Sequence, residues 1–210
     1  MNLYLAAVVA SAFLLVLCGI VCHWLARTHR WEPAPTTWIL LTTTMCLSGL
    51  MYFTSPERSW TKNIAVTAGI ANNLLILSGV LKGRRLKGLW ESFTKRQRQS
   101  VYMSSIVFGF WLVTVGTYSL LSYILVQLIG LFAYIGTVEK LLTVQKVTEP
   151  PFLWISVFLA SLCALYPAVT KHDVYAMVYL GRAIPSVGGV IYLIYRARAR
   201  ERKQLLLALA

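Results

Sequence analysis

The feature that most constrains this chain is a series of seven apolar runs, each about as long as a membrane-spanning helix. Such a helix needs about 20 mostly apolar residues, because the hydrocarbon core of a bilayer is about 30 Å thick. Only 13% of the 210 residues are charged, whereas about 25% is typical of soluble domains. The sequence therefore predicts an all-α membrane protein with seven transmembrane helices, at residues 3–25, 37–54, 62–81, 101–118, 120–138, 152–169 and 174–195.

The fourth and fifth runs adjoin one another, and the first run stands at the N-terminus. Residues 101–138 are almost continuously apolar, and a single helix of that length would extend about 57 Å. A bilayer cannot hold such a helix, so we expect a turn at Gly116-Thr117-Tyr118-Ser119. The first run lacks the basic leading segment of a cleavable signal peptide, and we expect it to be the first span.

The net charge of +13 is distributed unevenly along the chain. Sixteen of the twenty Lys and Arg residues lie in the segments that follow the first, third, fifth and seventh runs, which share one side of the predicted membrane. Because cytoplasmic segments carry the excess of basic residues, the N-terminus is predicted outside and the C-terminus in the cytoplasm. Contact with anionic lipid headgroups accounts for this pattern, and no basic–aromatic module for nucleic acid is present.

An internal repeat is visible in two short stretches, "WEPAPTTW" at 31–38 and "TEPPFLW" at 148–154. Their Glu-Pro pairs are 117 residues apart, and Trp38 and Trp154 are 116 residues apart. The starts of the first three predicted spans recur in the last three at offsets of 117, 115 and 112 residues. Because three helices in series reverse the direction of the chain, one extra helix between the copies keeps the copies parallel.

The predicted architecture is therefore a 3+1+3 arrangement, in which two parallel triple-helix repeats are related by an axis along the membrane normal. Transporters include this class of repeat, with substrate sites between the repeats near the middle of the membrane. The predicted division is a first repeat at 1–81, a basic cytoplasmic loop at 82–100, a linker helix at 101–118, a second repeat at 120–196 and a basic cytoplasmic tail at 197–210.

The second half of the chain carries a resemblance to a known family. Its matching features are Pro151 before Phe152 and Trp154, Ser156, Leu165-Tyr166, Lys171-His172-Asp173-Val174, and Tyr192, Tyr195 and Arg196. This pattern resembles the three-helix unit of the SWEET/PQ-loop transporter superfamily. It is closer still to the N-terminal membrane domain of lipid-A-disaccharide-synthase-like proteins. The first half resembles the same unit through its layout, its Pro-x-x-Trp start and its Asn-bearing third helix.

The chain also departs from the family pattern. The Pro-Gln dipeptide that names the PQ-loop group is replaced by Val144-Gln145. The third helix of the unit usually carries Asn or Gln; Asn72-Asn73 fit in the first repeat, but Arg182 or Ser186 stands there in the second. Other seven-helix classes do not fit, since 174–195 contains neither a retinal-binding Lys nor the Tyr-Gly-Trp run of nicotinamide riboside transporters.

Arg182 is the clearest candidate for a functional residue, because a charge inside a bilayer costs about 2.5–3.5 kcal/mol on insertion scales. Its guanidinium could bind a carboxylate or phosphate. The alternatives are extension to the outer interface and a structural pair with Asp173 or Glu57. Adjacent helical residues point about 100° apart, so at most one of Asn72 and Asn73 should face a central cavity. The predicted substrate-binding set is Asn72, Asn73, Gln127, Tyr166, Tyr179, Arg182 and Ser186.

Five prolines are predicted at hinges or gates. Pro185 interrupts the last span, where it removes a backbone hydrogen bond. Pro33, Pro35, Pro150 and Pro151 stand at the cytoplasmic starts of helices, as helix starters or as bending points. Near the same side, Trp38 and Trp154 are expected in aromatic belts, and Glu139 and Glu149 as solvated interfacial groups.

No pattern of residues points to an enzyme. Cys18, Cys22 and His23 are neighbours, but no second cluster supports a metal site, and packing is the favoured interpretation. No Ser-His-Asp set or pair of carboxylates shares one face. His172-Asp173 is interpreted as a helix cap. We therefore expect neither catalytic residues nor a metal nor a cofactor.

The leading hypothesis is a small transporter that moves a polar or anionic solute (sugar, vitamin, amino acid or sugar-lipid headgroup) by alternating access. Two alternatives stay open: an accessory membrane protein that binds or presents a lipid-linked sugar for envelope glycolipid synthesis, and a receptor with the SWEET fold. A transporter should have a polar cavity between the repeats, and a lipid-handling protein an opening toward the bilayer. The expected partners are membrane lipids and a small-molecule or lipid-linked substrate, but no nucleic acid. Self-association into a homo-oligomer is left open, and the expected location is the bacterial inner (plasma) membrane.

Overall fold

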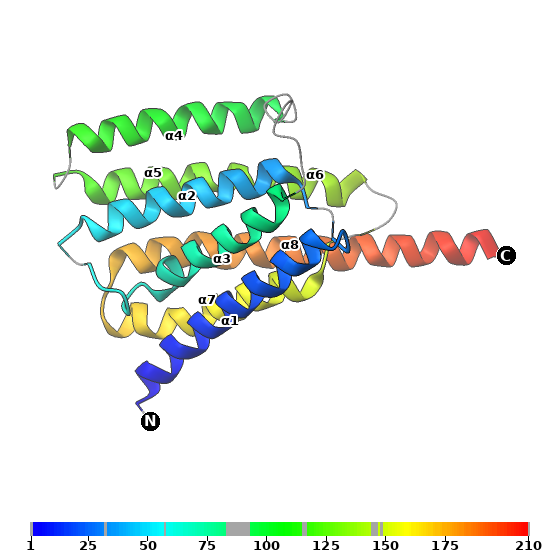
Figure 1. Ribbon diagram of the computed structural model, residues 1–210, viewed down its shortest axis with the longest axis horizontal. Helices are drawn as coiled ribbons and strands as arrows, with labels where there is room; N and C mark the ends of the chain where they lie inside the picture. The colour runs from blue at the N-terminus through cyan, green and yellow to red at the C-terminus, as the bar shows by residue number, and fades with distance from the viewer. Residues whose placement is uncertain are drawn as a thin grey trace.

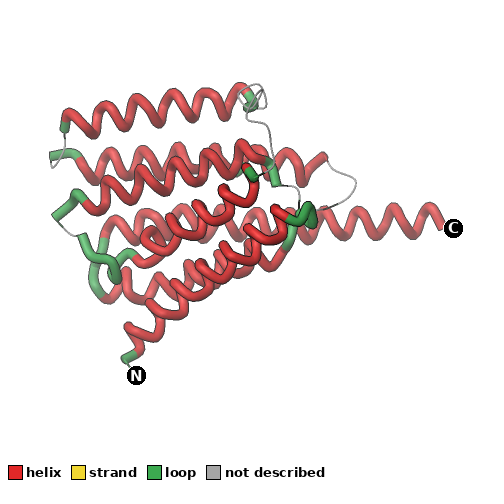
Figure 2. Tube along the Cα trace, viewed as in Figure 1, coloured by secondary structure: helices red, strands yellow, loops and turns green. Residues whose placement is uncertain are grey.

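The computed structural model describes residues 2–31, 33–56, 58–82, 93–114, 117–143, 147 and 149–209. All regular structure in these residues is helical (Figure 2). The helices are α1 (Leu3–Arg27), α2 (Pro35–Phe53), α3 (Ile64–Leu81), α4 (Lys95–Val113), α5 (Ser119–Ala133), α6 (Ile135–Thr143), α7 (Pro151–Thr170) and α8 (Val174–Leu209). Helices α5 and α6 follow one another with a break at Tyr134.

Within the described residues, six helical stretches are long and apolar enough to cross a membrane. They are α1, α2, α3, α5 with α6, α7 and the first part of α8. These are the features of an integral membrane protein, as the apolar runs predict. Of the turn predicted within 101–138, Gly116 lies outside the described residues. The run is nevertheless divided there, since α4 ends at Val113 and α5 begins at Ser119.

Helix α4 differs from the predicted fourth span. It begins at Lys95, inside the predicted basic loop, and ends at Val113 rather than at residue 118. It is absent from the six stretches that qualify as membrane spans in the described part of the chain. The reason is its first turn, where a Thr94–Gln97 capping box starts the helix among basic residues and so shortens its apolar length. Residues 83–92 of the predicted loop lie outside the described residues.

Helix α8 is 36 residues long, which corresponds to about 54 Å. It continues through residues 197–209 of the predicted tail and extends beyond the bundle (Figure 1). Arg200 holds it to the end of α6, donating hydrogen bonds of 2.8 Å to the Leu141 carbonyl and 3.3 Å to the Leu142 carbonyl. A basic side chain is favourable there because the last carbonyls of a helix have no intrahelical partner.

The order of packing in the bundle is simple. Helix α3 packs against both α1 and α2, and α8 packs against both α7 and α5. Across the bundle, α1 contacts α7 and α2 contacts α5, while α4 lies on the outside against α5 (Figure 1). The N-terminus and the C-terminus lie at opposite ends of the bundle. The basic residues Arg27, Arg30, Lys140 and Arg196 therefore share the end from which α8 extends, which we call the basic end.

Several helix ends follow from local sequence. Pro35 and Pro151 occupy the first turn of α2 and α7, where the missing N–H removes no helical hydrogen bond. Asp173 caps α8 by accepting a hydrogen bond of 2.9 Å from the Ala176 N–H, which confirms the predicted cap. His29 and His172, with φ of 57° and 51°, end α1 and α7 in the left-handed conformation that usually selects glycine.

Two glycines bring α1 and α3 unusually close together. A Cβ placed on Gly79 would lie 2.8 Å from the backbone of His23, and one on Gly19 would lie 3.2 Å from the Asn72 Cα. Small residues allow such close packing of membrane helices, where van der Waals contact replaces the hydrophobic effect. The position of α3, which carries Asn72 and Asn73, therefore depends on these contacts.

We predict that Gly79→Ala destabilises the bundle by about 1–3 kcal/mol, because the added methyl group meets backbone that cannot move alone. The matched control is Gly109→Ala on α4, where a Cβ meets nothing within 4 Å. That change should be neutral or stabilising by up to about 1 kcal/mol. Thermal unfolding of the purified proteins in detergent measures both effects. Equal melting temperatures for the two variants would contradict the close α1–α3 packing.

Candidate functional site

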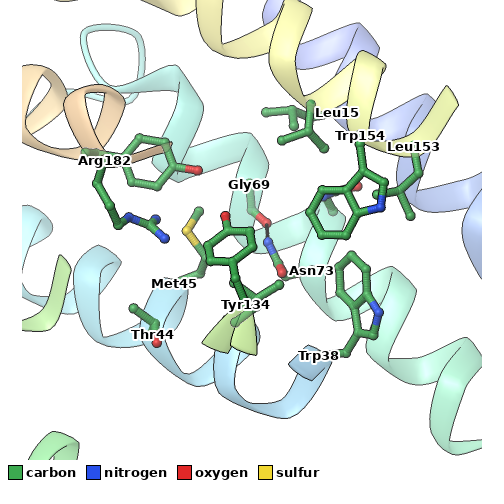
Figure 3. A pocket seen from close by; sticks show the side chains of 14 residues that line it. Leu15, Trp38, Thr44, Met45, Gly69, Asn73, Tyr134, Leu153, Trp154 and Arg182 are labelled. Carbon is green, nitrogen blue, oxygen red and sulfur yellow. Dashed lines mark hydrogen bonds between the residues drawn. The ribbon is translucent and has the colours of Figure 1, made fainter. Parts of the chain in front are cut away.

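A small cavity lies in the centre of the bundle, where α1, α2, α3, α7 and α8 meet the end of α5 (Figure 3). Its volume is about 30 Å³, which is room for about two water molecules. Apolar and aromatic side chains form most of its wall. The lining residues are Leu15, Trp38, Leu41, Thr44, Met45, Gly69, Asn72, Asn73, Tyr134, Leu153, Trp154, Val157, Tyr179 and Arg182.

The guanidinium of Arg182 is the only ionised group among the lining residues. It points into the cavity toward Met45 and Tyr134 (Figure 3). Arg182 is eight residues from the start of α8, or about 12 Å along the helix. It passes over Gly130 of α5, where an added Cβ would lie 3.2 Å from Arg182 Nη1 and 2.9 Å from Thr44 Cγ2. A side chain at this point would crowd both the guanidinium and Thr44.

Arg182 lacks a compensating carboxylate among the described residues. Its Nε and Nη1 atoms are buried and donate no hydrogen bond. Asp173 instead accepts a hydrogen bond of 2.8 Å from the Tyr52 hydroxyl, and the single ion pair of the described chain joins Lys140 to Glu149. Glu57, the other predicted partner, lies outside the described residues.

Two aromatic rings partly offset the charge of Arg182. The guanidinium carbon is 5.2 Å from the centre of the Tyr179 ring and 6.0 Å from the centre of the Tyr134 ring. Such cation–π contacts are worth about 0.5–2 kcal/mol each. They do not replace the hydrogen bonds that buried N–H groups normally make. The guanidinium is directed toward the cavity (Figure 3).

Both asparagines line the cavity, but they make different contacts. Asn73 donates a hydrogen bond of 2.9 Å from Nδ2 to the Gly69 carbonyl, and its Oδ1 is buried without a partner. Asn72 turns toward α1, where its Oδ1 lies 3.2 Å from the position of a Cβ on Gly19. That oxygen also has no partner. Asn73 is therefore the better placed of the two to accept a hydrogen bond from a ligand.

The other predicted site residues are divided between two places. Gln127 and Ser186 line a second, open hollow between α5 and α8, together with Arg182 and Pro185. Gln127 donates a hydrogen bond of 2.6 Å to the Ser48 hydroxyl, while its Oε1 has no partner. Ser186 donates to the Arg182 carbonyl. Tyr166 lines neither space; it is 41% exposed on the outer surface of α7.

The basic end of the cavity is closed by aromatic side chains from the two echoing stretches. Trp38 and Trp154 are in contact, with ring centres 6.1 Å apart, and both line the cavity. They are 4% and 2% exposed, so the expected location in aromatic belts is wrong. The indoles face each other across the bundle instead of facing the lipid headgroups, because α2 and α7 both begin at this end. Tyr134 and Trp31 extend the cluster, with ring centres 6.0 Å from Trp154 and 5.6 Å from Trp38 respectively.

Behind this aromatic cluster lies a buried acidic group. Glu149 accepts a hydrogen bond of 3.1 Å from the Trp31 indole N–H and forms an ion pair of 3.1 Å with Lys140. Glu149 is 2% exposed, which corrects the expectation of a solvated interfacial group. The Lys140 ammonium makes this burial tolerable because it balances the charge. Glu139, one residue before Lys140, is exposed as expected.

The opposite end is closed by a tyrosine cluster. Tyr52 of α2 donates its hydrogen bond to Asp173 at the start of α8. The Tyr175 ring contacts both Tyr52 and Tyr123, with centre distances of 5.8 and 5.0 Å. All three tyrosines are buried. Side chains from both halves of the chain thus pack against one another toward both ends of the bundle, on either side of the central cavity.

Sequence reasoning missed Gly130 and Tyr134, which together set the position of the Arg182 guanidinium. A signal for them was present. Gln127, Gly130 and Tyr134 are spaced by three and four residues and so lie on one face of a helix. Gln127 belongs to the predicted substrate-binding set, and the other two residues share its helical face.

The remaining predicted residues are assigned as follows. Pro33 and Pro150 precede α2 and α7, Pro185 lies within α8, and a further proline, Pro167, lies within α7. The Sγ atoms of Cys18 and Cys22 are 4.0 Å apart in the core. No group of three potential metal-binding side chains occurs in the described ranges. Val144-Gln145 lie outside them.

Comparison with known proteins adds no assignment. The chain matches no protein-family model, no curated protein and no solved structure. Function must therefore be argued from the cavity and its surroundings.

We predict that Glu149→Ala lowers the free energy of unfolding by about 1–3 kcal/mol, because it removes the buried carboxylate that accepts from the Trp31 indole N–H and pairs with the Lys140 ammonium. Glu139→Ala removes the same charge from an exposed position and should change stability by less than about 0.5 kcal/mol. Unfolding of the detergent-solubilised proteins by heat or SDS measures the difference. If both variants unfold at the same point, Glu149 does not hold the basic end together.

Proposed function

We propose that this protein is a membrane transporter built from two parallel triple-helix repeats with α4 as the linker helix. The packing of the helices supports the repeat: the third helix of each proposed unit, α3 or α8, packs against the other two. The first helix of each unit contacts the second helix of the other, as α1 with α7 and α2 with α5. A two-fold axis between the units would produce this pattern.

The equivalent residues also support it. Helices α1 and α5 begin 116 residues apart, and so do α2 and α7. Trp38 and Trp154, which the repeat makes equivalent, contact each other, as residues close to a two-fold axis would. Glu32 and Thr148 of the two echoing stretches lie outside the described residues. In this proposal the basic end faces the cytoplasm, following the distribution of Lys and Arg.

The observation that carries the proposal is the uncompensated charge of Arg182 in the central cavity. A cation held in the middle of a membrane protein without a carboxylate partner is a binding group for an anion. Its planar N–H donors suit a carboxylate or phosphate, and Asn73 Oδ1 could accept from a neighbouring hydroxyl. We therefore propose an anionic solute in preference to a neutral sugar.

The two closed ends suggest how such a solute would move. The Trp31–Glu149–Lys140 cluster closes the basic end, and the Tyr52–Asp173 hydrogen bond closes the other. Each joins the first half of the chain to the second. In an alternating-access cycle one cluster would open while the other stayed closed, and the small central cavity corresponds to the step in which both are closed.

A second candidate is an accessory protein that binds or presents a lipid-linked intermediate. One observation favours it: Arg182 also lines the hollow between α5 and α8, which is open to the side of the bundle. Binding without transfer across the membrane would distinguish this function from transport.

We predict that Arg182→Gln abolishes stabilisation by anions. Loss of charged hydrogen bonds of about 1.5–3 kcal/mol should weaken binding about 10- to 100-fold. Arg182→Lys should retain part of the affinity, since it keeps the charge but loses the planar donors. The measurement is the shift in melting temperature of the purified protein with a panel of carboxylates, phosphate esters and neutral sugars.

The matched control is Arg58→Gln, which removes the same charge from an exposed loop residue. It should leave every shift in melting temperature unchanged. If Arg182→Gln binds all the anionic ligands as tightly as the unchanged protein, the proposed site is wrong.

The transport proposal makes a further prediction for proteoliposomes. The anion that stabilises the protein most should be taken up with saturable kinetics, and Arg182→Gln should reduce uptake to the level of empty vesicles, because its charge provides the binding energy in the cavity. Arg58→Gln vesicles with the same protein content serve as the control. Binding without uptake above that level would favour the accessory function.

A further inference from the structure

The hollow between α5 and α8 is the larger of the two spaces that reach Arg182. Its volume is about 560 Å³, within the range of about 300–1,000 Å³ that is usual for ligand pockets. The central cavity, at about 30 Å³, holds little more than water. The body of a ligand therefore fits in the hollow and not in the central cavity. The hollow is lined by Ile124, Gln127, Leu128, Leu131, Val178, Gly181, Arg182, Pro185 and Ser186.

The hollow opens toward the side of the bundle. Leu128 and Leu131 on α5 are 53% and 44% exposed, and Gly181 and Pro185 on α8 are exposed too. Both helices are membrane spans at this level, so their exposed apolar side chains face lipid. A molecule that occupies the hollow in the membrane consequently enters from the hydrocarbon layer, with no need for either closed end to open.

The inner wall of the hollow carries one cationic group and two hydrogen-bond acceptors. Arg182 and Gln127 both line the hollow, and Arg182 carries a positive charge. Beneath its surface, Arg182 Nε and Nη1 are buried donors and Gln127 Oε1 is a buried acceptor, all without partners. Pro185 has no N–H to donate to the Gly181 carbonyl, so the backbone offers an acceptor on the same wall. An apolar entrance that ends on one cation and two acceptors fits a molecule with a hydrocarbon chain and an anionic, hydroxyl-bearing head.

We propose that the ligand is an anionic lipid, which enters sideways between α5 and α8 with its acidic head on Arg182 and its chain in the bilayer. This proposal rests on the assignment of Arg182 as the anion-binding group in the proposed function. The chain adds little affinity, since the surrounding lipid is as apolar as the walls of the hollow. Its role is to present the head at the depth of Arg182, and the charge of the head provides the selection.

The test uses the full chain in nanodiscs of phosphatidylcholine. Lysophosphatidic acid, which has one acyl chain and a phosphate head, should raise the melting temperature in a saturable way. Lysophosphatidylcholine, with the same chain but no net charge, should not. Inorganic phosphate supplies the anion without the chain.

Gly181 provides the variant that separates entry from binding. A Cβ on Gly181 meets nothing within 4 Å and Gly181 lines the hollow, so Gly181→Trp is expected to place its ring there. This substitution should weaken the binding of lysophosphatidic acid about 10- to 100-fold, because the head would no longer make its charged hydrogen bonds to Arg182. Gly189→Trp, at an equally open position on α8 outside the hollow, should change affinity by less than about twofold. Gly181→Leu repeats the test if the Trp variant does not fold.

The outcomes separate the two proposals. Sideways entry is wrong if lysophosphatidic acid fails to stabilise the protein while water-soluble anions stabilise it through Arg182. It is also wrong if the Gly181 variants bind lysophosphatidic acid with unchanged affinity. In both cases the anion site at Arg182 stands. If Arg182→Gln binds every anion with unchanged affinity, both proposals are wrong. Both proposals are supported if the Gly181 and Arg182 variants lose stabilisation by lysophosphatidic acid while Gly189→Trp binds it with unchanged affinity.

Discussion

The arrangement of this protein around its centre depends on one unbalanced charge. The Arg182 guanidinium lies among apolar and aromatic side chains, and no described carboxylate neutralises it. Its position is set by what surrounds it: Gly130 leaves room, Tyr134 and Tyr179 lie near it, and Thr44 bounds it from α2. A charge in this environment is costly unless an anion joins it, and the proposed anion site rests on this imbalance.

The ends of the cavity are held by a different kind of interaction. At the basic end, a buried carboxylate is shared by an indole N–H and an ammonium group; at the other, a tyrosine hydroxyl is bound to a buried aspartate. Buried polar groups of this kind favour a single arrangement, because any other leaves one of them without a partner. They also join the two halves of the chain. The hollow between α5 and α8 instead reaches Arg182 from the side of the bundle. A ligand from the bilayer would therefore meet Arg182 without disturbing either end.

Much of the fold could be predicted because membrane spans depend on length and hydropathy, which are local properties. The bounds of α1, α2, α3 and α7 differ from the predicted spans by at most two residues at either end. The other helices differ more: a local capping box starts α4 six residues early among basic side chains, the fifth span continues through α6 to Thr143, and α8 continues to Leu209. Of the predicted site residues, Asn72, Asn73, Tyr179 and Arg182 line one cavity, while Tyr166 faces outward. A tyrosine near a helix end is equally suited to core and surface, so its sequence position could not decide between them.

The sequence by itself determined the all-helical membrane class of the described chain and the approximate extent of α1, α2, α3 and α7, and it placed a charged residue inside the last predicted span. Each follows from the energy of placing a residue in hydrocarbon, which depends on residue type. Only the tertiary structure decided that Trp38 and Trp154 face each other, that Glu149 is buried, and that Arg182 lies over Gly130 between a closed cavity and an open hollow. Those facts depend on which helix faces meet. Apolar residues cover all sides of these helices, so hydropathy alone leaves their rotation undetermined.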